Sequence, residues 1–521
     1  MALSLKRLLL NDQKLLVKRY SQATKNNKKW KSVVGLEVHA QIASKSKLFS
    51  GAPTKFSNPV NTNVSLFDMA TPGTLPVLNK RCVEAGVLTA LALNCQVNPV
   101  SYFDRKHYFY ADLPAGYQIT QQRLPLAVNG ALEFHVFTPE IHKKPYKTSA
   151  RIKQLQLEQD SGKSLHDFDR SLVDLNRAGI SLMELVFEPD LSDGEEAAAL
   201  IKELIAIFQR IETCSCKMEE GALRVDANVS IHKENEPLGI RTEIKNIGSV
   251  RGVVGAVNYE IKRQIAIKES NGVVVNETRA WNFEKKITVP MRDKEILQDY
   301  RYMPEPNLPP LQVSMGPITG GQVYVDQIKE NIPELPEKCR QRLQTDMGLS
   351  TEQSIIIVND VDLMKLFENA LYARSINPVK FANFLINDLY KALNERKLEI
   401  HQLHIEPKYF GEILELVSQG LITRNVASMV LNELLQGNIR SPLEIVEEKN
   451  WKQITDEKEL EKICQAILQE NPKGVTQYLN GKVKVFKAFL GGVANKTDNR
   501  ADMKKVETIL KKILSELRNK K

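Results

Sequence analysis

The sequence predicts an α+β region, followed by an all-helical region and a small helical tail. Short segments with strand-like alternation, punctuated by Gly and Pro, run from residue 32 to residue 311. A Pro-rich stretch at 304–310 ends that pattern, and helical periodicity dominates afterwards. We therefore expect domains at 31–315, 316–446 and 447–521, preceded by a targeting segment at 1–30.

Amphipathic helices are expected in both later regions. Residues 410–417 show helical spacing, and Gly420 is a candidate C-cap. The last helix has an apolar stripe made of Val506, Ile509, Leu510, Ile513, Leu514 and Leu517. Its other positions are basic: Lys504, Lys505, Lys511, Lys512 and Arg518. The stripe predicts core packing. Periodicity leaves open whether the lysines are a solvated face or a phosphate-contacting surface.

Composition is that of an ordinary globular chain. Of 521 residues, 42% are hydrophobic and 26% charged. No apolar run approaches the roughly 18 residues of a membrane span, so no membrane insertion is expected. The net charge of +9 suits an RNA-binding protein and a basic mitochondrial enzyme equally. Of the six cysteines, only Cys214 and Cys216 are close, and no second pair completes a zinc site; free thiols are expected.

Residues 1–30 are typical of a mitochondrial transit peptide. Lys and Arg recur through 6–29 against a single acid, Asp12, and leucines at 8–10 and 15–16 make the stretch amphipathic. Cleavage near 19–21 is expected. A disordered basic tail is the alternative.

Five segments share one design, with functional side chains on one face of a strand and apolar side chains on the other. They are residues 35–42, 154–160, 182–188, 223–230 and 241–245. Besides His39, their polar faces carry Glu37, Glu158, Asp160, Glu184, Glu188, Asp226 and Glu243. A sheet face with so many carboxylates repels itself unless cations neutralise it.

Two interpretations of this face stay open. Hard oxygen ligands with one imidazole suit Mg²⁺ that also binds phosphate. The cations available to hold phosphate oxygens are Lys106, Lys163, Arg224, Arg241 and Lys245. The alternative is a solvated, salt-bridged sheet face.

Common catalytic motifs do not match. Gly162, Lys163 and Ser164 look like the end of a phosphate-binding loop, but Leu157 stands where its leading glycine should be. Zinc-protease, serine-hydrolase and protein-kinase motifs are missing from the sequence. Cys214 and Cys216 lack the context of a glutaminase nucleophile and are expected to be buried.

A series of motifs nevertheless stands in the order known from one family. The motifs occupy residues 35–39, 103–110, 157–163, 174–179, 188–190, 218–228, 241–246 and 299–306. On these residues the chain resembles the B-subunit family of glutamyl-tRNA(Gln) amidotransferases, in its mitochondrial form, from about residue 32 to the C-terminus.

The resemblance implies a cradle-like catalytic domain whose antiparallel sheet is similar to the glutamine synthetase and guanido kinase fold. It implies that ATP and Mg²⁺ serve to phosphorylate the γ-carboxylate of glutamate esterified to tRNA(Gln), and that ammonia then displaces the phosphate. The implied partners, in the mitochondrial matrix, are Glu-tRNA(Gln) and the two other components of the amidotransferase, the glutaminase (GatA) and GatC. The tail at 447–521 is expected to bind tRNA.

The resemblance also assigns roles by motif. The catalytic residues are Glu37, His39, Lys106 and Glu158. The metal ligands are Glu37, His39, Glu158, Asp160 and Glu184. The nucleotide- or phosphate-binding residues are Lys163, Arg224, Asp226, Arg241 and Lys245. Many bacterial relatives have two adjacent acids where this chain has Glu158 and Gln159, so we expect an amide to replace one ligand carboxylate.

Simpler roles remain open for several residues. His39 would otherwise be an ordinary strand-face histidine, and Lys106 a solvated lysine. His107, Tyr108 and Tyr110 are expected to pack or to shape the cleft. Arg292 and Arg301 either contact tRNA or tie the Pro-rich segment to the first domain. Two rival functions are a ligase acting on free glutamate and a non-catalytic RNA-binding subunit.

Overall fold

The computed structural model describes residues 29–167, 169–291, 300–316, 323–374 and 376–519. The chain divides between Cys339 and Arg340 into two compact units, and each is described by itself. Nearly all of the targeting segment expected at 1–30 lies outside the described residues. The domain boundaries expected at 315 and 446 stay predictions. In the described part of the chain, no helix is both long enough and apolar enough to cross a membrane.

The first unit is built on a nine-stranded sheet, ordered β14-β13-β12-β11-β1-β10-β7-β6-β2. Its strands are β1 (Lys31–Gln41), β2 (Gln96–Val97), β6 (Ala127–Val136), β7 (Tyr146–Gln159), β10 (Ser181–Phe187), β11 (Leu223–His232), β12 (Thr242–Lys245), β13 (Thr278–Asn282) and β14 (Ile287–Pro290). Every pairing is antiparallel except that of β12 with β13. The predicted α+β class, with a large antiparallel sheet, is confirmed.

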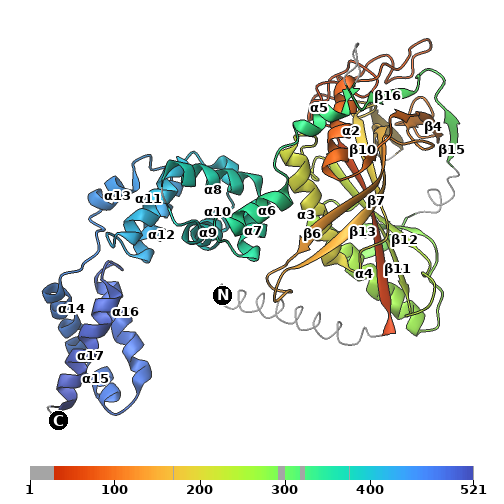
Figure 1. The fold of residues 1–521 in the computed structure, drawn as a ribbon. Helices are drawn as coiled ribbons and strands as arrows, with labels where there is room; N and C mark the ends of the chain where they lie inside the picture. Colours follow the sequence, from red (N-terminus) through yellow and green to blue (C-terminus); the bar gives the residue numbers. More distant parts are fainter. Residues whose placement is uncertain (1–28, 168, 292–299, 317–322, 375, 520–521) are drawn as a thin grey trace. The chain divides into compact units, whose positions relative to one another are not determined.

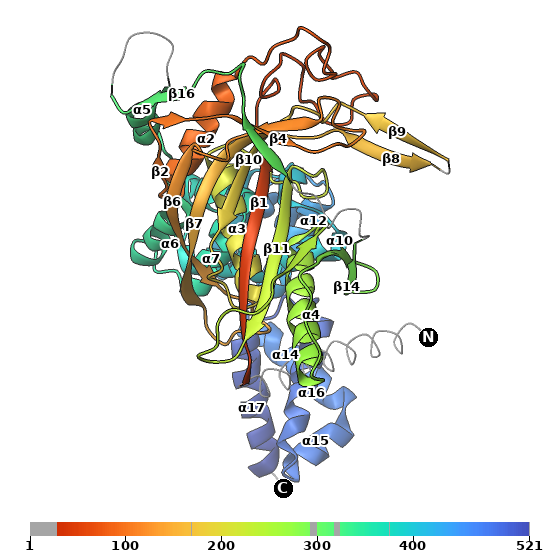
Figure 2. The same cartoon turned by 90° about the vertical axis from the view of Figure 1, so that its right-hand side faces the viewer.

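Three helices cover one face of this sheet: α2 (Lys80–Ala92), α3 (Gly194–Arg210) and α4 (Val250–Glu269) (Figures 1 and 2). The alternation of β1 explains the packing, because every second side chain is apolar and packs in one core with the helices. The β1 residues of this core are Val34, Leu36, Val38 and Ala40. Glu37 and His39, which alternate with these residues, therefore point to the opposite face. The three helices leave that face uncovered.

Strand register brings distant functional residues into rows on that uncovered face. His39 pairs with Glu184 on β10 and with Arg224 on β11, and Glu37 pairs with Asp226. Directly opposed residues of antiparallel strands point to the same face of a sheet. The register therefore aligns these side chains before any loop contributes.

A small sheet, ordered β15-β4-β5, lies beside the large one. It consists of β4 (Asp104–His107), β5 (Tyr117–Thr120) and β15 (Arg301–Pro304). Arg105 fastens the β15 segment to β4 through two hydrogen bonds to Glu305, of 2.7 and 3.1 Å. The small sheet thereby gains a fixed position for Lys106.

The rest of the first unit consists of short elements. They are β3 (Val100–Ser101), β8 (Lys163–Asp167), β9 (Arg170–Asp174), β16 (Leu311–Ser314), β17 (Val323–Tyr324) and α5 (Val325–Glu330). Helix α6 (Pro336–Thr345) crosses the division between the units.

The second unit is helical, as predicted. Its helices are α7 (Thr351–Val358), α8 (Val361–Ala373), α9 (Pro378–Phe384), η3 (Leu385–Leu389), α10 (Tyr390–Arg396), η4 (Ile400–Gln402), α11 (Pro407–Ser418), α12 (Arg424–Leu435), α13 (Pro442–Glu448), α14 (Glu457–Glu470), α15 (Pro472–Leu479), η5 (Val483–Val485), α16 (Phe486–Lys496) and α17 (Met503–Asn519). Gly420 follows α11 with a φ of +70°, the left-handed conformation that often ends a helix.

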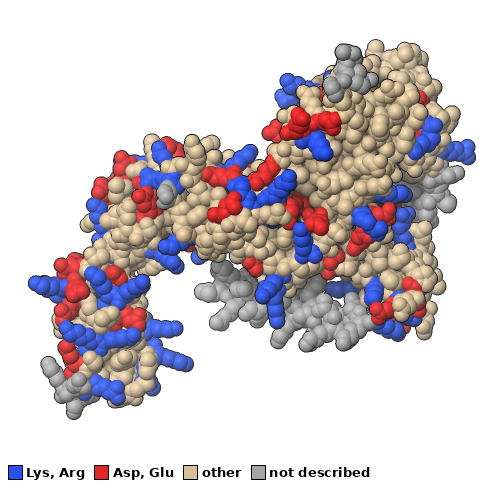
Figure 3. Space-filling view, viewed as in Figure 1, with Lys and Arg blue, Asp and Glu red and all other residues tan. Residues whose placement is uncertain are grey.

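Helix α17 confirms the predicted apolar stripe. Val506, Leu510 and Leu514 are buried in a core shared with α14 and α16, while Leu517 at the end of the stripe is 38% exposed. Lys504, Lys511 and Lys512 are exposed. Lys and Arg side chains spread over the tail helices at the lower left of Figure 3, with acids among them. The basic positions of α17 therefore stay on the surface.

A buried ion pair holds the long connection at residues 42–79 of the first unit. Lys47 Nζ lies 3.0 Å from Asp68 Oδ2, and the two side chains are 0% and 1% exposed. Asp68 also accepts hydrogen bonds from the Ser50 hydroxyl at 3.0 Å and from the Ser65 N–H at 2.9 Å. Removing one partner of such a pair leaves an uncompensated buried charge.

We expect Asp68→Asn to destabilise the first unit by about 3 kcal/mol, because Lys47 then loses its counter-charge while the side-chain shape is kept. Denaturant unfolding of the full chain, followed by tryptophan fluorescence, measures the change; Trp30 and Trp281 belong to the first unit and Trp451 to the second. Glu234→Gln is the matched control, because it breaks the exposed Lys31–Glu234 pair and should leave the unfolding midpoint unchanged. An unchanged midpoint for Asp68→Asn would show that the buried pair does not hold this connection.

Candidate active site

A cavity of about 930 Å³ opens on the uncovered face of the nine-stranded sheet. Strands β1, β7, β10, β11 and β12 contribute to its lining, and β4 of the small sheet contributes Lys106. The predicted site residues in the lining are Glu37, His39, Lys106, Glu158, Asp160, Glu184, Arg224, Asp226, Arg241 and Lys245. The fold thus brings together residues that are spread over more than half of the first unit's sequence.

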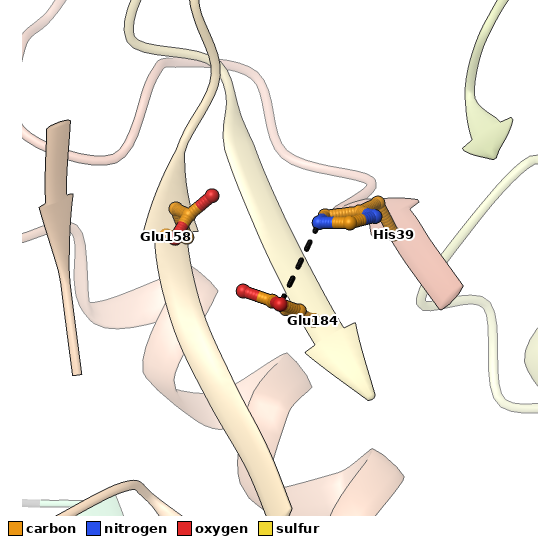
Figure 4. A group of neighbouring side chains, drawn as sticks. All are labelled: His39, Glu158 and Glu184. Atoms are coloured by element: carbon orange, nitrogen blue, oxygen red, sulfur yellow. Dashed lines mark ion pairs between the residues drawn. The ribbon is translucent and has the colours of Figure 1, made fainter. Parts of the chain in front are cut away.

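Three adjacent strands place His39, Glu158 and Glu184 next to one another (Figure 4). One ligand-type atom of each residue lies within 4.8 Å of the others, and His39 Nε2 is 3.8 Å from Glu184 Oε1. Two carboxylates and an imidazole are a donor set for a divalent cation, and the oxygen majority favours a hard one such as Mg²⁺.

The two carboxylates of this group are short of counter-charge. Burial raises the pKa of both Glu158 and Glu184. Burial lowers the pKa of Lys106, but the attraction of Glu158 and Glu184 outweighs it, so that this pKa lies above its ordinary value. Glu158 Oε2 is buried and has no hydrogen-bond partner among the described residues. A buried carboxylate oxygen without a partner fits a site for a further cation.

His39 is held in its neutral form. Burial, followed by the positive charge of Arg224, lowers its pKa from 6.5 to about 4, although Glu158 opposes the change. A neutral imidazole at pH 7 keeps a nitrogen lone pair for a metal ligand bond, which a protonated imidazole lacks.

Gln156 positions Glu184, a role that the sequence did not single out. Gln156 Nε2 donates to Glu184 Oε2 at 2.7 Å and to Thr120 Oγ1 at 3.1 Å, and its Oε1 accepts from Gln154 at 2.5 Å. Alternation along 154–160 does place Gln156 on the polar face. Its contact with Glu184 follows from the β7–β10 register, which the sequence does not state.

A second set of charges lies on β11 and β12. Arg224 Nη2 donates to Asp160 Oδ2 at 2.9 Å, and the buried Arg224 Nε has no partner among the described residues. Lys245 Nζ lies 3.8 Å from Asp226 and 3.7 Å from Glu243. Burial raises the pKa of Asp226 to about 6, against the effect of Lys245. Lys245 is only loosely paired, and Arg224 keeps one N–H without a partner among the described residues, so both are suited to receive phosphate oxygens.

The remaining assigned residues take other positions. Glu37 and Asp160 line the cavity but lie outside the three-residue group, so their ligand roles stay predictions. Glu188 lies beyond β10 and is not part of the cavity lining. Lys163 is exposed at the start of β8, also outside the lining. Because Lys163 and Ser164 begin a strand rather than a helix, they do not form a phosphate-binding loop, which agrees with the sequence.

Gln159 does not occupy a ligand position. Its Oε1 accepts a hydrogen bond from the Ile119 N–H at 2.8 Å, and its backbone oxygen accepts one from Gln118 Nε2 at 2.8 Å. Strand alternation turns Gln159 toward β5 when Glu158 points into the cavity. The expected replacement of a ligand carboxylate by this amide is therefore wrong: the amide joins the small sheet to β7.

Aromatic residues around Lys106 complete the cavity. Tyr108 and Tyr110 line it, in agreement with the expectation that they shape the cleft, and Tyr300 lines it as well. The backbone of Arg301 pairs with His107 in β15 and β4, which ties the Pro-rich segment to the small sheet. Arg292 lies outside the described residues. None of the six cysteines forms a disulfide, and all are buried, including Cys214 and Cys216, for which burial was expected.

The fold and the site together define a class of protein: an α+β region with a large antiparallel sheet, whose cavity holds a group of candidate metal ligands, followed by a helical region. The family model described as the GatB/GatE catalytic domain matches residues 32–318, and the model described as the GatB domain matches residues 365–514. The chain belongs to the GatB/GatE family.

Relatives that match nearly the full length of this chain support the same family. The chain is 54% identical to the B subunit of mitochondrial glutamyl-tRNA(Gln) amidotransferase from Aedes aegypti over 499 residues, 94% of each chain. It is 46% identical to the human protein of the same name, over 94% of this chain and 90% of the relative. It is 42% identical to the B subunit of aspartyl/glutamyl-tRNA(Asn/Gln) amidotransferase from Rickettsia canadensis, over 94% and 98%.

We expect the His39 imidazole to titrate near pH 4 in metal-free buffer. Arg224→Gln should raise this pKa toward 6.5, because burial and then the charge of Arg224 are the two main causes that lower it. Because the folded pKa lies below the unfolded one, the unfolded chain takes up the proton first. His39 therefore lowers stability as pH falls from about 6.5 to about 4. NMR of ¹³C-labelled histidine, assigned with His39→Gln, measures the titration. A wild-type midpoint near 6.5 would contradict the buried, neutral imidazole.

Proposed function

We propose that this chain is the ATP-using B subunit of a mitochondrial amidotransferase that converts Glu-tRNA(Gln) into Gln-tRNA(Gln). The observation that carries the proposal is the convergence of His39, Glu158 and Glu184 beside Lys106, in a chain of the GatB/GatE family. The names of the relatives support the tRNA substrate and a mitochondrial location, for which we propose the matrix.

The reaction needs activation, because a carboxylate oxygen is a poor leaving group. In the first step, an oxygen of the glutamate γ-carboxylate attacks the γ-phosphorus of ATP; the new O–P bond forms, the bond to the β-phosphate oxygen breaks, and ADP leaves. In the second step, the nitrogen of ammonia attacks the acyl carbon. A C–N bond forms, the C–O bond to phosphate breaks, phosphate leaves, and the nitrogen loses a proton.

The residues present fit Mg²⁺, since a buried carboxylate oxygen without a partner among the described residues, a second carboxylate and a neutral imidazole converge. His39, Glu158 and Glu184 would hold the ion, with Glu37 and Asp160 as further donors in the cavity. When bound, Mg²⁺ neutralises phosphate charge and fixes the reacting groups.

The cations of the cavity bind the two substrates in different roles. Lys106, which faces the two buried carboxylates, binds the γ-carboxylate or the transferred phosphoryl group. Arg224, Arg241 and Lys245, which line the same cavity, hold the phosphates of ATP. We further propose that the nine-stranded sheet and its helices form a cradle of the glutamine synthetase and guanido kinase type, because the uncovered polar face carries the reacting groups.

Ammonia is assigned to a partner. Cys214 and Cys216 are buried in the core and so are not exposed nucleophiles. We therefore propose that the glutaminase of the complex, GatA, supplies the ammonia and that GatC holds the complex together. A shielded path keeps ammonia unprotonated and able to attack.

The two rival functions predict different properties of the protein. A ligase acting on free glutamate would hydrolyse ATP in the presence of glutamate alone, whereas this proposal requires charged tRNA. A non-catalytic RNA-binding protein does not need Glu158, a buried carboxylate whose Oε2 has no hydrogen-bond partner among the described residues. The exposed lysines of α17 favour an RNA substrate, and we propose that the tail at 447–521 binds it.

We expect Glu158→Gln to lower the rate of glutamine formation at least about 100-fold, because it removes a charged metal ligand. The chain is assayed with its co-purified partner proteins, charged tRNA, Mg-ATP and glutamine, and the amino acid released from the tRNA is identified. The Kd for tRNA should change less than about twofold. Glu133→Gln, which alters an exposed acid on β6, is the control and should keep full activity. Normal turnover by Glu158→Gln would favour the non-catalytic, RNA-binding function.

We expect removal of residues 449–521 to raise KM for charged tRNA and to reduce the salt dependence of its binding, because exposed lysines leave with the tail. Lys504→Gln combined with Lys511→Gln and Lys512→Gln should reproduce part of the effect without deleting a helix. Binding titrations at several salt concentrations give the slope. An unchanged slope in both variants would remove the tail from the RNA-binding surface.

A further inference from the structure

We propose that Tyr108, Tyr110 and Tyr300 form a stacking site for the terminal base of the charged tRNA at the mouth of the cavity. The inference rests on the proposed function and deepens it, because it names how the RNA end of the substrate is held. These three residues are called the tyrosine cluster below.

The tyrosine cluster is assembled from two distant segments. Tyr108 and Tyr110 follow β4, whereas Tyr300 precedes β15, and the pairing of these two strands brings the segments together. The Tyr108 ring lies 5.7 Å from Tyr110 at an interplanar angle of 70°, and 5.6 Å from Tyr300 at 81°. Edge-to-face contacts of this kind brace aromatic rings against one another. Tyr108 therefore supports the other two rings.

Exposure shows that the cluster is not simply a piece of core. Tyr110 is 42% exposed and Tyr300 is 40% exposed, yet all three tyrosines line a cavity whose other walls are largely charged. Exposed, braced aromatic rings in a polar cavity offer flat apolar surface to a flat ligand. Proteins that bind single-stranded nucleic acid use such rings as stacking platforms, together with nearby cations.

Lys106 links the cluster to the reacting group. Its Nζ lies 4.9 Å from the centroid of the Tyr300 ring, and the same ammonium faces Glu158 and Glu184. In a charged tRNA the amino acid is esterified to the ribose of the last nucleotide. A terminal base and the γ-carboxylate beside it must therefore be bound close together, as a base site next to Lys106 allows.

The adenine of ATP offers the same ring chemistry and is the competing ligand. The candidate phosphate-binding cations, however, lie on β11 and at β12, whereas the tyrosine cluster belongs to the β4 and β15 segments. Tyr300 nevertheless interacts electrostatically with Lys245. The contact of Tyr300 with Lys106, beside the two buried carboxylates, favours the RNA end, and the KM for ATP distinguishes the two ligands.

The test compares binding of uncharged tRNA(Gln) with binding of the same tRNA lacking its terminal nucleotide, using the full chain with its co-purified partner proteins. Wild type should prefer the complete tRNA. Tyr300→Ala and Tyr110→Ala should reduce this preference by about 5- to 100-fold, the usual effect of losing one stacked base. Tyr300→Phe and Tyr110→Phe keep the ring and should keep the preference. Tyr102→Ala is the matched control, because Tyr102 is also 40% exposed but lies outside the cavity lining.

A second arm measures KM for ATP in the same variants. An increased KM for ATP in Tyr300→Ala, with the preference for the complete tRNA intact, would assign the cluster to the adenine of ATP and overturn the proposal. Unchanged values in both arms would make the cluster structural and overturn it equally. Because the tRNA comparison uses neither ATP nor glutamine, its outcome is independent of glutamine formation, which tests the proposed function.

Discussion

The burial of Glu158 and Glu184 on neighbouring strands is the constraint on which the first unit depends. Burial deprives both carboxylates of hydration and raises the pKa of both; a neighbouring carboxylate adds to the effect, Glu184 for Glu158 and Glu37 for Glu184. Lys106 offsets part of that cost, and His39 stays neutral beside them. The arrangement is unfavourable for the protein alone and is suited to binding a cation with its phosphate ligands.

The position of the small sheet brings Lys106 close to these two acids. Lys106 belongs to a four-residue strand that would have no fixed position by itself. Arg105 joins this strand to the Pro-rich segment through Glu305, and Gln159 joins its neighbour β5 to β7. Consecutive residues of β7 thus serve two purposes, because Glu158 faces the cavity while Gln159 holds the small sheet. Gln156 adds a third, since it fixes the orientation of Glu184.

The cavity has walls of different chemistry, which suits a reaction that must bring two anionic substrates together. Cations on β11 and at β12 line it together with aromatic rings, one of which lies beside Lys106. His39, Glu158 and Glu184 lie on the adjacent strands β1, β7 and β10. Strand β11 is the neighbour of β1, and the small sheet contacts β7. Phosphoryl transfer depends mainly on positioning and charge neutralisation, and the proposed roles of the aromatic rings and the cations correspond to these two needs.

The sequence by itself determined the class of fold, the helical second unit, the polar faces of five strand segments and nearly all charged residues of the cavity. Alternation with a period of two and helical periodicity are local properties, so they can be read without knowing which elements meet. The tertiary structure alone decided which polar residues converge. Strand register brought His39, Glu158 and Glu184 together while leaving Glu188 and Lys163 outside. It also placed β5 where Gln159, turned away from the cavity by alternation along β7, can bind it. Tyr300 and Gln156 acquired their contacts in the same way, because pairing between strands far apart in the chain is set by packing of the whole sheet and leaves no local trace in the sequence.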